Sequence, residues 1–512
     1  MPDVLTGLAA ALADKAAIID DRPGEAVVTV TFAELEVRAN QLAHLLGELG
    51  AGPGVKVVWC GQNSASLLVA THAIRKVGAV GVPLNYRLTR EEAAYVVDNS
   101  DAQIMWVDAE YLPLAEAIRP DCPKLDHVLV FDTEGNGRGA VERRLAALPS
   151  TPPPDPDPEA GAGGTMIYTS GTTGRPKGAL RGPATDPSQI GRLIGLIGYQ
   201  PDDVYITTGP LYHSGPGGFA GIAHSLGNTV VVQHHFDPED WLRLVETHRV
   251  TTSFTAPTPV RMICTLPGEV KARYDRSSMK RLIANAAPWT LALKKLYLAD
   301  FPTDSLWEVY GSTELGVDTV LAPDDHLRKP GSCGKPAPGV EIKLFTADGA
   351  EVTEPHTTGE LYVRAKTMFS TYYKAEEKYE ADRRGEYHTV GDIAYFDEDG
   401  YFYIADRKND MIISGGMNIY PAEIEAAIDA NPDVFEVAVF GVPDEQWGER
   451  VHAVVVPARQ GVTVEQIQAQ AREHLAGYKV PRSITFAESL PKTGSGKVLK
   501  RELRQTVVPP AS

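Results

Sequence analysis

The chain has 512 residues, of which 43% are hydrophobic, and its 49 basic and 67 acidic residues give a formal net charge of -18. This length suits more than one domain with large cores, while the negative charge argues against nucleic acid or an anionic membrane as the main partner. The four cysteines lie far apart without a Cys-x-x-Cys motif, so we expect reduced thiols in the core. A basic segment followed by an apolar core is not seen at the start, and long apolar runs are lacking, so we expect a soluble, cytoplasmic protein without a transmembrane segment.

The first part of the chain alternates between two kinds of pattern. Helix-like stretches at 32–49 and 64–77 are interspersed with short β-rich runs at 55–60, 104–107 and 127–131. This alternation predicts α/β layers.

Residues 168–178 read YTSGTTGRPKG and follow a β-prone apolar stretch. Glycines let a backbone approach phosphate oxygens closely, hydroxyls donate hydrogen bonds, and a lysine adds charge, so we interpret this segment as a loop around ATP phosphates. A flexible Ser/Gly/Thr linker is the alternative, but the β-rich start and the Arg-Pro-Lys make it the weaker reading. The predicted phosphate-binding residues are Thr169, Ser170, Gly171, Thr172, Thr173, Gly174 and Lys177.

This loop differs from the phosphate loop of common NTPases. Pro176 stands where that loop has a glycine, and Gly178 stands where it has the hydroxyl that holds Mg²⁺. Another metal ligand follows a later apolar run, in Tyr310-Gly311-Ser312-Thr313-Glu314. A tyrosine can stack on adenine, Thr313 can bond a phosphate oxygen, and Glu314 can ligate Mg²⁺.

With both motifs in order, the chain resembles the adenylate-forming superfamily of acyl-CoA synthetases, adenylation domains and beetle luciferases over essentially its full length. Four further segments match it in order, at 390–392 (Val-Gly-Asp), 406–410, 414–425 and 491–497. The resemblance implies an α/β protein with a large N-terminal domain of layered sheets and helices, and a smaller mobile α+β C-terminal domain.

The resemblance also implies the domain limits. We expect an N-terminal domain at 1–406 with the ATP and acyl sites, and a C-terminal lid at 407–512 with the catalytic lysine. The hinge residue is Asn409, where the family usually has Asp or Lys. The segment 149–164 is rich in Pro, Gly and Asp, and we interpret it as a surface crossing inside the large domain rather than a domain linker.

The family forms acyl-AMP from a carboxylic acid and ATP and then turns the lid so that CoA can attack. By resemblance, Lys497 is the catalytic lysine, although a lysine in a Gly/Ser loop is more often simply solvated. Asp392 binds the ribose, with Arg407 nearby. The nucleotide site also includes Tyr310, Gly311, Ser312, Asn285, Ala286 and Ala287.

The acyl site is expected from His213, Gly217, Asn285, Ala286, Trp289 and Leu315. By resemblance, His213 stands where the family places a His or an aromatic residue at the mouth of the acyl tunnel, so we expect a gate. His213 also follows a β-rich run and opens a glycine-rich turn, which favours a site residue over a structural histidine. The family's Gly-Gly-Ala-Pro is here Asn285-Ala286-Ala287-Pro288. The larger side chains should narrow or polarise the pocket, which favours a medium-chain, aryl or functionalised acid over a long straight chain. His234 and His235 are read as surface residues.

The CoA site is expected from Arg87, Gly415, Gly416, Trp447 and Lys479. Trp447 resembles the aromatic that stacks on CoA adenine in aryl-CoA ligases, although it could equally close the small core. The prediction is an AMP-forming acid–CoA ligase that uses ATP, Mg²⁺ and CoA. The alternative is an amide synthetase, or an adenylation enzyme that loads a carrier protein. The sequence leaves the oligomeric state open, a homodimer included.

Overall fold

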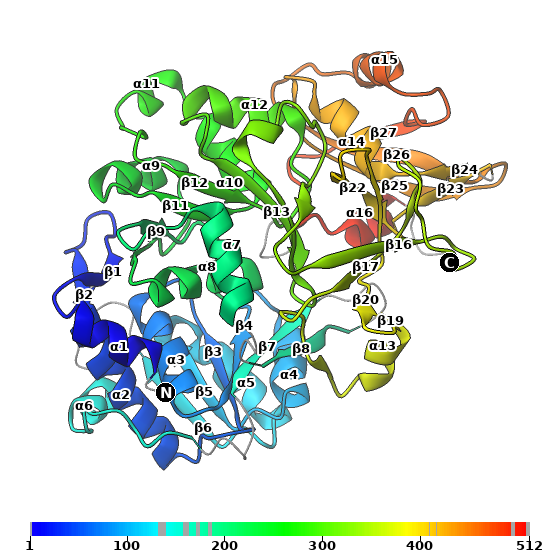
Figure 1. The fold of residues 1–512 in the computed structure, drawn as a ribbon. Coiled ribbons are helices and arrows are strands. Elements are labelled where there is room, and N and C mark those ends of the chain that lie inside the picture. Colours follow the sequence, from blue (N-terminus) through cyan, green and yellow to red (C-terminus); the bar gives the residue numbers. More distant parts are fainter. Residues whose placement is uncertain are drawn as a thin grey trace.

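The computed structural model describes residues 3–131, 140–156, 163–169, 175–182, 187–408, 410–415, 417–492 and 497–507. Within these ranges the chain forms four β-sheets with helices packed against them (Figure 1). The α/β class is therefore confirmed. We call the residues up to 407 the large lobe and those from 410 onward the small lobe.

The first part of the large lobe, mostly blue and cyan in Figure 1, supplies six strands of a seven-stranded sheet in the order β18-β8-β7-β4-β3-β5-β6; the edge strand β18 comes from later in the chain. Strands β7, β4, β3, β5 and β6 pair in parallel, and β4 and β5 are buried along their whole length, which explains their apolar sequences. The strands are β3 (Lys56–Cys60), β4 (Val80–Leu84), β5 (Ile104–Asp108), β6 (His127–Phe131), β7 (Gly164–Thr169), β8 (Lys177–Arg181) and β18 (Thr371–Tyr373). The helices of this part are α1 (Val4–Ala11), α2 (Phe32–Glu48), α3 (Ala65–Lys76), α4 (Arg90–Asn99), α5 (Leu112–Ile118) and α6 (Ala140–Ala146), with 3-10 turns η1 (Ala109–Tyr111) and η2 (Arg119–Asp121).

A nine-stranded sheet follows in the order β15-β14-β13-β12-β11-β9-β10-β1-β2. Its strands are β1 (Ala16–Asp20), β2 (Val28–Thr31), β9 (Val204–Ile206), β10 (Thr229–Val232), β11 (Thr252–Thr255), β12 (Arg281–Ala284), β13 (Leu306–Ser312), β14 (Gly316–Leu321) and β15 (Lys335–Pro336). The accompanying helices are α7 (Pro187–Ile197), α8 (Ser214–Ser225), α9 (Pro238–Thr247), α10 (Pro257–Cys264), α11 (Gly268–Lys271) and α12 (Leu291–Asp300), with the 3-10 turn η4 (Pro323–Asp325).

The large lobe ends in a six-stranded antiparallel sheet, in the order β19-β20-β17-β21-β22 with β16 beside β17. It contains β16 (Glu341–Phe345), β17 (Gly359–Arg364), β19 (Arg383–Arg384), β20 (Tyr387–His388), β21 (Asp392–Phe396), β22 (Phe402–Arg407) and helix α13 (Glu376–Ala381).

The small lobe, orange and red in Figure 1, is a five-stranded sheet with three helices. Its elements are β23 (Ile412–Ser414), β24 (Met417–Ile419), β25 (Val434–Asp444), β26 (Gly448–Pro457), β27 (Ser483–Phe486), α14 (Pro421–Asp429), α15 (Val464–His474) and α16 (Lys500–Val507). Its two apolar clusters use residues from Ile412 onward, so this lobe has a core of its own.

The proline-rich segment after α6 lies on the large lobe. Its described part, up to residue 156, has no helix or strand. Asn40 donates to the carbonyl of Ser150 at 2.7 Å, and the ring of His44 bonds the carbonyl of Thr151 at 2.9 Å. This part is therefore a surface crossing over α2, as predicted.

Two expectations from composition can be compared with the structure. Cys60, Cys122, Cys264 and Cys333 are all buried and unpaired by disulfides. None of the helices in the described ranges combines the length and the apolar character that crossing a bilayer requires.

Candidate active site

The ends of β7 and β13 bring the two sequence motifs together. The Thr169 hydroxyl donates to Glu314 Oε1 at 2.7 Å, and the Tyr372 hydroxyl donates to the same oxygen at 3.0 Å. Glu314 is only 8% exposed. Lys177 lies opposite Thr169 on β8, whereas the predicted loop residues 170–174 lie outside the described ranges.

Thr313 is held from two sides by residues that the sequence did not single out. Its hydroxyl lies 2.8 Å from the Ser214 hydroxyl at the start of α8. Its carbonyl accepts from the Arg181 guanidinium, which also donates to the carbonyl of Thr367. Burial lowers the pKa of Arg181, partly offset by the charges of Glu314 and Asp318. Arg181 thus connects the phosphate-loop strand to Thr313.

The predicted ribose and adenine residues also meet. The Tyr310 hydroxyl donates to Asp392 Oδ2 at 2.5 Å, and Arg407 Nε lies 3.3 Å from Asp392 Oδ1. Asp392 and Arg407 face each other across β21 and β22, which fixes their approach. Burial and the adjacent Asp392 raise the pKa of Tyr310, so its hydroxyl remains a donor.

Asp318 is another residue that the motifs did not reveal. It lies at the irregularity where β14 shifts register against Tyr310 and Gly311, and it is 0% exposed. Within the described chain neither carboxylate oxygen has a hydrogen-bond partner. Burial, followed by the charge of Asp392, raises its pKa, so the site favours the neutral acid. In the sequence Asp318 stands between Val317 and Thr319, and this local pattern does not mark it as a site residue.

Lys497 of the small lobe lies near the predicted ribose residues Asp392 and Arg407. Burial and the charge of Arg407 lower its pKa to about 8, while Asp392 and Asp410 oppose the shift. Three residues later, Lys500 forms a 2.8 Å ion pair with Glu425 of α14. Lys497 is therefore half-buried and lies near charged groups of both lobes.

The expected acyl residues border the start of α8 and the end of β13. The ring of His213, the residue before α8, lies 4.4 Å from that of Tyr212. A side chain at Gly217 would meet the carbonyl oxygen of Leu211 at 2.4 Å, so close packing requires this glycine. Leu315 is completely buried.

The loop 285–288 satisfies its own polar groups. The Asn285 amide donates to the carbonyl of Val309 at 2.5 Å, and its oxygen accepts from the backbone of Ala286. Ala286 has φ of 73°, a left-handed conformation that costs a non-glycine residue about 1 kcal/mol. Trp289 is 4% exposed, packs with α12 in the second core and donates to the carbonyl of Asn285. Ala287 completes the loop.

The expected CoA residues fall into separate places. Gly415, at φ of 58°, donates its backbone N–H to Trp447 at 2.8 Å, and a side chain there would meet the Trp447 ring at the same distance. The Arg482 guanidinium lies 4.7 Å from the centre of that ring. Lys479 pairs with Glu423 at 2.6 Å, and Arg87 lies over Tyr86 in the large lobe. Gly416 and the hinge residue Asn409 lie outside the described ranges.

The histidine pair at 234–235 differs slightly from the prediction. His235 is exposed, but His234 is half-buried and bonds the carbonyl of Asn63 at 2.7 Å. His234 is therefore a packed residue, because its ring ties two strand ends together.

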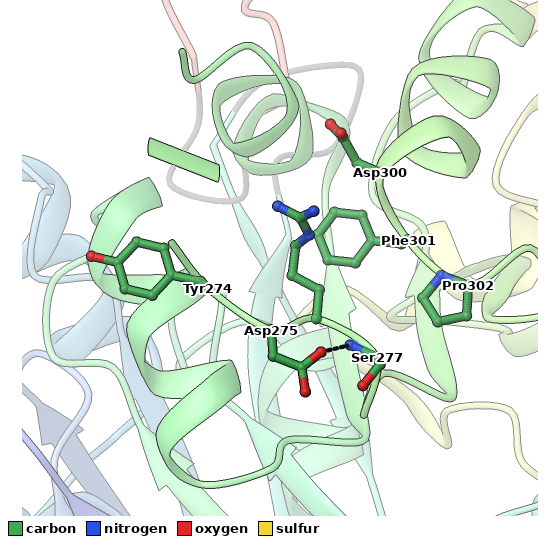
Figure 2. Close-up of a pocket in the computed structure, with 7 residues that line it drawn as sticks. Tyr274, Asp275, Ser277, Asp300, Phe301 and Pro302 are labelled. Atoms are coloured by element: carbon green, nitrogen blue, oxygen red, sulfur yellow. Dashed lines mark hydrogen bonds between the residues drawn. The ribbon is translucent and has the colours of Figure 1, made fainter. Parts of the chain in front are cut away.

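A surface pocket lies away from these residues, near the ends of α11 and α12 (Figure 2). The Arg276 guanidinium lies 5.9 Å from the Phe301 ring within it. None of the predicted site residues lines this pocket, so we do not assign it to the active site. Its lining residues are Tyr274, Asp275, Arg276, Ser277, Asp300, Phe301 and Pro302.

Comparison with known proteins gives the family. The model of the AMP-binding enzyme family matches residues 7–373, and that of the AMP-binding enzyme C-terminal domain matches residues 423–497. Feruloyl-CoA synthase from Amycolatopsis sp is 35% identical over 486 residues, covering 93% of this chain and 94% of that protein.

Solved structures of the same family are similar to this chain over nearly its full length. An anthranilate CoA ligase, AuaEII, in complex with anthranoyl-AMP has a TM-score of 0.88 at 26% identity, covering 98% of this chain and 96% of that one. The amide bond synthetase McbA from Marinactinospora thermotolerans has a TM-score of 0.85 at 27% identity, covering 99% of this chain and 100% of that one. The chain therefore belongs to the AMP-binding family of adenylate-forming enzymes, in its branch of ATP-dependent acid–CoA ligases.

Proposed function

We propose that this ligase activates an aryl or similarly functionalised carboxylic acid, with Lys497, Thr313 and Glu314 as its catalytic residues. The observation that carries the proposal is the position of the half-buried Lys497 of the small lobe near Arg407 and Asp392 of the large lobe. Thr169 of the first motif bonds Glu314 of the second motif, next to Thr313, although the two motifs lie far apart in the chain.

In the first half-reaction the substrate carboxylate attacks the α-phosphorus of ATP. A carboxylate oxygen–phosphorus bond forms and the bond to pyrophosphate breaks, which yields acyl-AMP. A carboxylic acid is already ionised near pH 7, so no side chain has to act as a general base. The residues instead neutralise charge and hold the two anions in line: Lys497 between carboxylate and α-phosphate, Thr313 on phosphate, and Asp392 on the ribose.

Glu314 fits a role as the Mg²⁺ ligand. Its buried carboxylate is surrounded by the hydroxyls of Thr169 and Tyr372, and oxygen donors of this kind suit Mg²⁺. When bound, the ion would neutralise charge on the phosphates, and ATP and water would supply its other ligands. Among the described residues no group of three or more His, Cys, Asp or Glu side chains could hold a metal.

In the second half-reaction the CoA thiol attacks the acyl carbon of acyl-AMP. A carbon–sulfur bond forms, AMP leaves, and the thiol proton passes to solvent. We propose that the small lobe turns about Asn409 for this step, with lobe limits at 1–406 and 407–512. Gly415 lets the backbone pack closely against the Trp447 ring, and that ring with the Arg482 guanidinium beside it offers a stacking and charged surface for the CoA nucleotide.

The preference for an aryl or functionalised acid rests on the loop 285–288. Asn285 and Ala286 add side chains where a glycine pair would leave space, and Trp289, which donates to the carbonyl of Asn285, is buried beside this loop. Feruloyl-CoA synthase and the anthranilate CoA ligase carry aryl acids in their names, which supports this class. The Asn285 amide is already paired with Val309, so the loop narrows the site without demanding a polar partner from the substrate.

A second candidate keeps the first half-reaction and changes the acceptor. The similarity to McbA favours an amide synthetase, in which an amine attacks acyl-AMP, over loading of a carrier protein. Trp447 and Arg482 are the observation against it, because an amine acceptor has no nucleotide to stack on them.

The test is ATP-dependent pyrophosphate release by the purified protein with aliphatic, branched and aryl acids, each with and without CoA, and product masses determined. Acyl-CoA formed from aryl acids in preference to long straight-chain acids would support the proposal. Release that CoA does not accelerate, with acyl-AMP remaining bound or an amide formed when amines are added, would favour the second candidate.

A further inference from the structure

Asp429, the last residue of α14, joins the small lobe to two helices of the large lobe. Arg261 of α10 donates to its Oδ1 at 2.7 Å, and Thr290, the N-cap of α12, donates to its Oδ2 at 2.5 Å. The Asp429 side chain is 6% exposed and that of Arg261 is 15% exposed. Both carboxylate oxygens are therefore used across the interface and largely shielded from water.

A second contact lies beside the first. Glu436 of β25 accepts from the Thr258 hydroxyl of α10 at 3.2 Å and from Lys492 of its own lobe. Lys492 also donates to Thr258 at 3.0 Å. Lys492 precedes Lys497 by five positions, so this contact fixes the start of the catalytic-lysine segment against α10.

We infer that Asp429 is a positioning residue for acyl-AMP formation: its bonds to Arg261 and Thr290 hold the small lobe where Lys497 reaches Asp392 and Arg407. The inference rests on the proposed two-step function. Arg261 and Thr290 occupy both carboxylate oxygens of Asp429 with largely shielded hydrogen bonds, which stabilise this lobe orientation. Without the Asp429 charge, the Arg261 guanidinium would stay desolvated and unpaired in this orientation but would be hydrated in a turned one. Loss of the Asp429 charge should therefore shift the balance away from the present orientation.

The contact of Asp429 with Arg261 and Thr290 should favour adenylation and oppose the turn of the lobe that thioester formation needs. Lys497 needs the present orientation, whereas a turned lobe must release Asp429 from both donors. Thr290 also follows directly after the loop 285–288 and Trp289, so the same contact ties the small lobe to the wall of the proposed acyl site. Weakening it should slow adenylation and leave thioester formation intact or faster.

The experiment compares the two half-reactions in Asp429→Asn. Single-turnover pyrophosphate release reports adenylation, and CoA added to synthetic acyl-adenylate reports thioester formation. We expect adenylation to fall about tenfold while thioester formation is unchanged or faster, a split that general loss of structure would not give. Equal losses in both half-reactions, or no loss in either, would overturn the inference. Asp433→Asn is the matched control, because Asp433 pairs with Arg459 within the small lobe and should leave both rates unchanged.

Two further measurements guard against misfolding of one variant. Arg261→Gln breaks the same pair from the large lobe, and the double variant with Asp429→Asn should be no slower than the worse single variant. Spin labels at Glu269→Cys and Glu465→Cys, both exposed, report the lobe orientation directly, since the native cysteines are buried. Asp429→Asn should add a second distance population. An unchanged distribution would contradict the inference even if the wild type makes no acyl-CoA, so its failure differs from failure of the proposed function.

Discussion

Two surfaces of the small lobe, the segment with Lys497 and the turn with Trp447, differ in whether they contact the large lobe. The segment with Lys497 is packed against the large lobe, where burial and Arg407 lower the lysine pKa to about 8. The turn with Trp447 is half-exposed and contacts groups of its own lobe, Gly415 and Arg482. Under the proposed function this lobe carries groups for both half-reactions, and in this structure the segment with Lys497, not the turn with Trp447, lies against the large lobe.

The largest expected effect comes from removing the engaged group. Lys497→Ala should lower acyl-AMP formation by about 100-fold or more, because a charge aimed at the reacting phosphate is lost. Thioester formation from synthetic acyl-adenylate should persist, measured by acyl-CoA production. If both reactions disappear, the two surfaces are not separate and the scheme fails.

The pH dependence should differ between the surfaces. Lys497 is protonated below its pKa of about 8 and loses its charge as the pH rises, so kcat/KM for pyrophosphate release should fall about tenfold per pH unit above that value. The thioester step should instead rise with pH, since thiols ionise near pH 8.5. Rates from pH 6 to 10 test this, and adenylation that stays level to pH 9.5 would contradict the lysine assignment.

Removing the Trp447 ring should affect thioester formation with CoA. Trp447→Ala should raise the KM for CoA about tenfold, because stacking on a nucleotide base contributes about 1–3 kcal/mol. Trp447→Phe is the matched control and should retain most of the affinity. Pyrophosphate release without CoA should be unchanged in both variants. A Trp447→Ala enzyme with normal CoA dependence would return this residue to a purely structural role.

The smallest expected effect concerns Asn285 in the loop 285–288, which borders the proposed acyl site in both half-reactions. Asn285→Gly removes the amide that bonds Val309 and Ala286, so bulkier and longer acids should be accepted a few-fold better relative to the preferred acid. The shift should be the same in both half-reactions, measured by competition between acids. An unchanged profile would remove Asn285 from the acyl site, and a shift in one half-reaction alone would show that the wall moves with the lobe.

Much of the fold could be predicted because its patterns are local. The runs at 104–107 and 127–131 are β5 and β6, and the helical pattern at 64–77 is α3. Thr169, Glu314, Asp392 and Lys497 were predicted because each lies in a short recognisable motif; in the structure Thr169 bonds Glu314, and Lys497 lies near Asp392. Their individual roles stay predictions until the variants are measured.

Other residues of the site could not be predicted, because their contacts join distant parts of the chain. Arg181 bonds a carbonyl 132 residues later, and Tyr372 reaches Glu314 across 58 residues. Asp318 looks like an ordinary strand residue until the shifted register of β14 places it in the interior. Side chains of these types occur throughout the chain, so only the fold distinguishes them.

The sequence by itself determined the family, the α/β class and the chemistry of the motifs, since these depend on residue types at fixed spacing. Tertiary structure alone decided which surface of the small lobe faces the nucleotide site, and how Asn285 and Asp429 are paired. Spacing along a chain carries no information on the orientation of one lobe against another. That orientation follows from contacts such as Arg261 with Asp429, which exist only when the two lobes meet.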